Sequence, residues 1–266
     1  MKHIEFVGLP GSGKTTFRKE CLSLLNASDI RAYNTYAVRW KAMRQILQQE
    51  SGLVWQILKF ASVFWEYRVL SLIWEKFRCS YILRFISNHP DLSHNAIDCA
   101  EHTRPPAWIP QSIVCSQSLI EWFFDMVGYY QAAQDILGDD EFFLQEEGPC
   151  QHAYYLLAFY NGEFDVKRLE AYLAAVPVPD MLIAFFTAPE LCEQRMNSRK
   201  KGVASDILTP LSVQQRLAVL EERLAVYRKI ADYLEQKGVA VLRLDNRNRD
   251  TTFRELREGL AVFHSS

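Results

Sequence analysis

The stretch GLPGSGKT at residues 8–15 decides the fold. It matches the pattern G-x-x-x-x-G-K-[ST] in full. Residues 2–7 (KHIEFV), which precede it, predict a buried strand, and residues 14–25 have the pattern of a helix. A strand, a glycine-rich turn and a helix in this order predict a βα unit at the start of an α/β fold.

The residue types in this stretch are those that bind phosphate groups. Glycines let the backbone curl so that its N–H groups point at phosphate oxygens, and the helix that follows presents its positive N-terminus. Lys14 would bring a mobile cation to the β- and γ-phosphates of a nucleoside triphosphate, and the Thr15 hydroxyl would ligate Mg²⁺. The candidate nucleotide-binding residues are Gly8, Pro10, Gly11, Ser12, Gly13, Lys14, Thr15 and Thr16.

Further strands are expected along the chain. A short strand is expected within 30–38, and others at 141–146 (EFFLQE), 181–187 (MLIAFFT) and 239–244. The run 181–187 is almost wholly apolar, which is typical of a strand that is buried on both faces and parallel to its neighbours.

Between residues 39 and 137 the pattern changes to helical periodicity. Apolar residues recur three and four positions apart, first along 53–77 and again along 113–137. Four prolines within 88–110 predict a loop with one short helix there. We interpret 39–137 as a helical insertion that binds the acceptor, within a single domain that spans 1–266.

These features resemble the P-loop nucleoside and nucleotide kinases, the group that contains adenylate, shikimate, gluconate and thymidylate kinases. The resemblance rests on GLPGSGKTT (8–16), MLIAFFTAPELCEQRMNSRKKG (181–202) and VLRLDN (241–246). It implies a three-layer P-loop NTPase fold, with a five-stranded parallel sheet in the order 2-3-1-4-5. It also implies a mobile lid at 195–210, in which Arg195 contacts a phosphate or stacks on the base and Arg199 contacts a phosphate.

Two glutamates, Glu146 and Glu147, end the strand expected at 141–146. A carboxylate at this place can hold the hydration shell of Mg²⁺, for which Glu146 is the candidate beside Thr15, or it can accept the proton of the acceptor. A solvated strand end is the ordinary alternative. The residues that follow, GPCQH at 148–152, differ from the motifs of thymidylate and deoxynucleoside kinases, which argues against those acceptors.

The charges of the chain nearly cancel, with 30 Lys and Arg against 32 Asp and Glu, which argues against a generic polyanion binder such as a nucleic-acid-binding protein. Residues 31–86 hold nine basic against three acidic side chains, whereas residues 87–165 hold one basic against thirteen acidic ones. The two stretches either attract each other as solvated surfaces or include a basic wall that faces the substrate. Arg39 and Arg44 are the candidates for binding an anionic acceptor at such a wall.

The cellular setting is expected to be reducing. The six cysteines are scattered without a Cys-x-x-Cys pair, and the N-terminal residues do not resemble a signal peptide, so a cytoplasmic location is expected. No run of 18 residues is free of charge, which argues against a transmembrane helix. The basic and aromatic stretch 53–86 leaves a peripheral membrane contact open.

The leading interpretation is therefore an ATP- and Mg²⁺-dependent kinase that phosphorylates a small-molecule, sugar or lipid-linked acceptor. The residues expected to act on the transferred group are Lys14, Glu146, Glu147, Arg195 and Arg199. The alternative is a nucleotide-dependent ATPase or switch whose helical insertion binds a protein partner.

Overall fold

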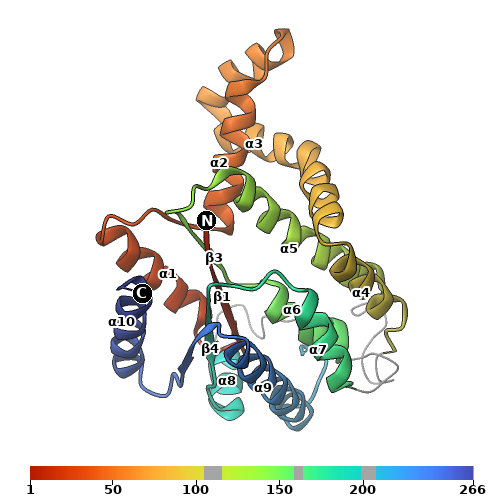
Figure 1. Ribbon diagram of the computed structural model, residues 1–266, viewed down its shortest axis with the longest axis vertical. Coiled ribbons are helices and arrows are strands. Elements are labelled where there is room, and N and C mark those ends of the chain that lie inside the picture. The colour runs from red at the N-terminus through yellow and green to blue at the C-terminus, as the bar shows by residue number, and fades with distance from the viewer. Residues whose placement is uncertain (105–115, 159–163, 199–207, 266) are drawn as a thin grey trace.

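The computed structural model describes residues 1–104, 116–158, 164–198 and 208–265, and Figure 1 shows their arrangement. Five strands form one parallel sheet in the order β2-β3-β1-β4-β5. The strands are β1 (Lys2–Gly8), β2 (Ala32–Asn34), β3 (Phe142–Gln145), β4 (Met181–Phe185) and β5 (Ala240–Leu244). The predicted α/β class and the predicted strand order 2-3-1-4-5 are both confirmed.

Helices pack on both faces of this sheet. Alternate side chains of β1 point to opposite faces, so Phe6 belongs to one apolar cluster and Val7 to another. The first cluster is closed by α1 (Lys14–Ala27) and α10 (Arg249–Ser265). The helices on the second face are α6 (Pro149–Leu157), α7 (Val166–Ala175), α8 (Pro189–Asn197) and α9 (Val213–Gln236).

The described residues between β2 and β3 form four helices. They are α2 (Thr35–Gln49), α3 (Leu53–Asn88), α4 (Pro90–Glu101) and α5 (Ser116–Ile136). In Figure 1, α2 and α3 extend away from the sheet, and α2, α3 and α4 all pack on α5. The helix α3 is broken at Trp65, where φ is −132° and ψ is 43°. No helix among the described residues is long and apolar enough to cross a membrane.

One boundary differs from the sequence prediction, and one predicted helix is confirmed. The strand expected within 30–38 ends at Asn34, because the side chain of Asn34 accepts a hydrogen bond from the backbone N–H of Ala37 at 2.9 Å and caps α2. The short helix expected within 88–110 is present as the 12-residue helix α4, and Pro90 stands in its first turn, where no N–H donor is needed. Residues 105–115 lie outside the described part.

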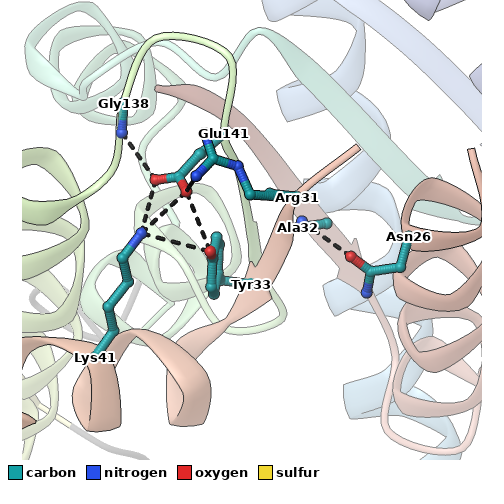
Figure 2. A network of polar contacts seen from close by, with 7 residues as sticks. All are labelled: Asn26, Arg31, Ala32, Tyr33, Lys41, Gly138 and Glu141. Carbon is teal, nitrogen blue, oxygen red and sulfur yellow. Dashed lines mark hydrogen bonds and ion pairs between the residues drawn. The ribbon is translucent and has the colours of Figure 1, made fainter. Parts of the chain in front are cut away.

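Ion pairs join the basic stretch 31–86 to the acidic stretch 87–165. Glu141 is only 2% exposed, and Figure 2 shows it receiving hydrogen bonds or ion pairs from Lys41 (2.8 Å), Arg31 (3.1 Å), Tyr33 (3.1 Å) and the backbone of Gly138 (2.9 Å). Burial would raise the pKa of this carboxyl, but the hydrogen bonds from Lys41 and Gly138 hold it below its ordinary value.

Two further pairs connect α3 to α5. Arg78 bonds Asp125 at 2.8 Å, and Arg84 bonds Asp135 at 2.7 Å. Part of the charge asymmetry along the chain is therefore used to hold α3 against α5 and α2 against the start of β3.

Candidate functional site

The glycine-rich loop (residues 8–15) joins β1 to α1 at the carboxyl end of the central strand. Gly11 (φ 88°) and Gly13 (φ 103°) adopt the left-handed conformation that favours glycine. A Cβ atom at Gly11 would lie 2.5 Å from the carbonyl oxygen of Cys192, and one at Gly13 would lie 2.5 Å from Nδ2 of Asn246. Glycine is required at both positions, for the backbone conformation and for the close packing.

Side chains from distant segments hold this loop in place. Nδ2 of Asn246, just after β5, donates to the carbonyl oxygen of Ser12 at 2.8 Å. Gln151 of α6 accepts from the backbone N–H of Gly8 at 2.9 Å, and its amide donates to the hydroxyl of Tyr227 on α9. The loop is thus held by hydrogen bonds from the residue after β5 and from α6.

Lys14 is nearly buried, with 8% of its surface exposed. Its Nζ donates to the carbonyl oxygens of Gly8 (2.7 Å) and Leu9 (3.0 Å) within the loop. Burial lowers the pKa of this amine to about 8, although Glu146 and Glu147 oppose the change. The amine is therefore a cation near neutral pH, in a place where few water molecules compete for it.

The structure brings Thr15 and Glu146 together, although they are 131 positions apart. The hydroxyl of Thr15 donates to one carboxylate oxygen of Glu146, and Nε of Arg18 bonds the other at 3.0 Å. The side chain of the next residue, Glu147, lines a cleft and is open to it on one side. The protein atoms around its other sides partly desolvate the carboxyl and raise its pKa, and the charge of Lys14 opposes the rise.

A cleft of about 710 Å³ opens beside these glutamates. Four aromatic side chains line it: Tyr36, Trp122, Tyr129 and Tyr155. Its polar lining is Arg18, Asn34, Thr35, Arg39, Asp125, Gln145, Glu146, Glu147 and His152. A cavity of this volume accommodates a small organic molecule. Burial lowers the pKa of His152 to about 4, so its ring is neutral at physiological pH.

The two arginines expected at an acceptor site lie in different places. Arg39 lines the cleft together with the glutamates. Arg44 is exposed and lines a separate hollow on α2 with Trp40 and Gln48. Of this pair, only Arg39 can therefore contact a molecule bound in the cleft.

The two arginines expected in a lid also differ. Arg195 stands in the last turn of α8, and its Nη2 donates to the carbonyl oxygen of Asn246 at 2.7 Å, beside the glycine-rich loop. Arg199 and most of the expected lid at 195–210 lie outside the described residues.

Three residues of the site were not anticipated from the sequence. Besides Gln151, they are Glu5 and Arg223, which are both fully buried. Glu5 accepts a hydrogen bond from the backbone N–H of Gln151 at 3.0 Å, and burial raises its pKa to about 7. Glu5 could have been noticed as the one acid within a buried strand, and Arg223 as a cation on the apolar face of a helix.

Comparison with known sequences identifies no relative: no family model matches the chain, and neither does any curated protein. The interpretation of this site therefore depends on its own geometry.

Proposed function

We propose that the chain is an ATP- and Mg²⁺-dependent kinase with a three-layer P-loop NTPase fold, which transfers the γ-phosphoryl group to a small-molecule, sugar or lipid-linked acceptor. The observation that carries this proposal is the contact between Thr15 and Glu146. It places a hydroxyl and a carboxylate between the glycine-rich loop and a cleft that has room for an acceptor.

The residues around the loop fit a triphosphate and a magnesium ion. The first N–H groups of α1 have no capping side chain, because its N-cap is Gly13, and such groups bind phosphate oxygens. The buried hydroxyl of Ser12 has no hydrogen-bond partner among the described residues. Thr15 and Glu146 offer the oxygen ligands that Mg²⁺ prefers.

Each charged residue then has a distinct task. Bound ATP and Mg²⁺ supply the phosphoryl group and neutralise part of its charge. Lys14 holds the phosphates, and Glu146 orients Thr15 and the water molecules of the metal. Glu147, at the cleft, accepts the proton of the acceptor hydroxyl. Arg195 neutralises phosphate charge, and Arg199 and the lid remain predictions from the sequence.

The first test is the substitution Lys14→Ala. Wild-type protein is incubated with labelled ATP and with nucleosides, sugars and lipid extracts as acceptors. We expect transfer to one acceptor class, and a loss of about 100-fold or more in the variant, because a cation that acts on the transferred charge is removed. Full transfer in Lys14→Ala would refute the proposal.

A pair of matched variants separates the two glutamates. Glu146→Gln should raise the Mg²⁺ concentration needed for half-maximal activity, whereas Glu147→Gln should lower kcat and abolish the acid limb of its pH profile. The ATPase or switch would be favoured instead if the protein released phosphate steadily without an acceptor and if no compound in the screen changed the rate of release.

A further inference from the structure

A histidine in the wall of the cleft has polar atoms that the described residues do not satisfy. His152, in α6, is 8% exposed and lines the cleft. Neither of its ring nitrogens forms a hydrogen bond with a described residue. Burial lowers its pKa to about 4, so the ring is neutral and offers one donor and one acceptor nitrogen. A buried polar group needs a hydrogen-bond partner, and in the wall of a cleft a bound ligand can supply it.

Tyr155 places a second polar group beside this ring. It lies three positions after His152 in α6, so the two side chains share a face of the helix, and their ring centroids are 5.7 Å apart. Both side chains line the cleft.

The hydroxyl of Tyr155 is held from behind by a buried arginine. Arg223, in α9, is 0% exposed, and its Nη1 donates to this hydroxyl at 3.2 Å. Its guanidinium carbon lies 4.7 Å from the ring centroid of Tyr155 and 4.4 Å from that of Tyr154. Because a guanidinium can only donate, the hydroxyl is the acceptor in this bond and keeps its own proton for another partner. Tyr155 therefore offers a fixed hydrogen-bond donor to the cleft.

An indole ring stands next to these two groups. Trp122, on α5, is 39% exposed and also lines the cleft. Its ring centroid is 6.3 Å from that of Tyr155, and the two ring planes meet at 78°. Rings in this arrangement form a corner, so a planar base cannot lie between them as it would between two parallel rings. The corner combines an apolar surface on Trp122 with the polar groups of Tyr155 and His152.

We propose that His152 and Tyr155 bind neighbouring hydroxyl groups of a sugar whose apolar face packs on Trp122, and that the acceptor of this site is therefore a saccharide. The inference deepens the proposed kinase function and rests on it for the transfer step. A sugar ring has a face of C–H groups and an edge of hydroxyl groups that both donate and accept, which matches the corner. An apolar chain would leave the nitrogens of His152 buried without a partner.

The first experiment measures the binding of small probes to the nucleotide-free protein by saturation-transfer NMR. The probes are glucose, galactose, mannose, N-acetylglucosamine, glucuronic acid, adenosine, uridine and 1-octanol. Glucuronic acid is included because Arg39 lines the same cleft. We expect at least one sugar to bind, and to bind more tightly than either nucleoside or the alcohol. If no sugar binds, or if a nucleoside or the alcohol binds more tightly, the inference is overturned.

Matched variants test the two polar residues. His152→Phe keeps an aromatic ring and removes both nitrogens, and Tyr155→Phe removes only the hydroxyl. Each should weaken sugar binding about tenfold, which is the effect of one hydrogen bond to a buried group. His94→Phe makes the same exchange at an exposed histidine of α4 and should leave the affinity unchanged. Unchanged affinity in both cleft variants, or an equal loss in His94→Phe, would refute the assignment.

Deoxy analogues of the bound sugar separate recognition from structural damage. The wild-type protein should bind the analogue that lacks a recognised hydroxyl group about tenfold more weakly than the parent sugar. In His152→Phe or Tyr155→Phe this preference should disappear, because the group that recognises the hydroxyl is gone. Structural damage alone would weaken both ligands equally and keep the preference, and that result would count against the inference.

The saccharide inference and the proposed function can fail separately. If a sugar binds with this dependence on His152 and Tyr155 but receives no phosphate from labelled ATP, the proposed function fails and the sugar site stands. If phosphate is transferred to a nucleoside or an apolar alcohol and to no sugar, the kinase function stands and the saccharide inference is overturned.

Discussion

Glu5 makes folding stability depend on pH in a direction that can be worked out from its surroundings. The carboxyl is fully buried in β1, and burial raises its pKa from 4.5 to about 7. The folded state therefore prefers the protonated form, and stability falls as the pH rises from about 4.5 through 7. One pKa unit corresponds to about 1.4 kcal/mol, so above pH 7 the ionised group costs the folded protein about 3 kcal/mol.

The substitution Glu5→Gln removes the ionisation and keeps an oxygen that can accept from the backbone N–H of Gln151. We expect the difference in unfolding free energy, variant minus wild type, to increase by about 2–3 kcal/mol as the pH is raised from 5 to 8. Urea unfolding of the nucleotide-free protein, followed by circular dichroism at several pH values, measures this difference. A difference that stays constant across that range would refute the reasoning.

Glu141 provides a comparison of opposite sign. Its pKa lies below the ordinary value, despite its burial, because of its hydrogen bonds to Lys41 and Gly138. Its carboxylate therefore stabilises the folded protein at neutral pH, and this contribution is lost as the pH falls through the lowered pKa. Glu141→Gln should destabilise the protein most at neutral pH, and a larger loss in acid would contradict the assignment.

Two other predictions concern the loop and the helix α3. Gly13→Ala should abolish Mg·ADP binding, because its Cβ would meet the side chain of Asn246. Gly238→Ala is the control: its φ of 86° is similar but the space around it is open, so it should bind Mg·ADP and lose only about 1–2 kcal/mol of stability. Equal binding by both variants would contradict the packing argument. If residues 53–86 contact a membrane surface, the protein should sediment with anionic vesicles, and salt should reduce this binding. Ile57→Gln, at a side chain that is 58% exposed, should weaken it further. Sedimentation that does not change with salt would count against the contact.

The sheet could be predicted because its signals are local. The runs around Phe6 and Ile183 are apolar enough to specify buried parallel strands, and the glycine-rich loop specifies the turn between the first strand and its helix. The end of β2 could not be predicted in this way, since Tyr36 and Val38 favour strands by type but follow the helix cap Asn34. One capping hydrogen bond outweighs a weak residue preference there.

The candidate site was predictable where its residues belong to one motif or to adjacent strand ends. Glu146 follows β3, which pairs with β1, so its approach to Thr15 follows from the strand order. Gln151 and Arg223 were missed because their roles depend on how α6 and α9 pack, which the helical period does not specify. The sequence indicates that Arg223 is on a buried face, but not which rings surround it.

The helix α2 connects two parts of the protein that are distant from each other. Near its start, Tyr36 and Arg39 line the cleft, and at its other end Lys59 of α3 donates to the carbonyl oxygens of Gln48 and Glu50. Fifteen helical residues make a stiff rod of about 22 Å. A molecule that contacts the outer part of α3 therefore lies against the same helix whose first turns line the cleft, about 22 Å away.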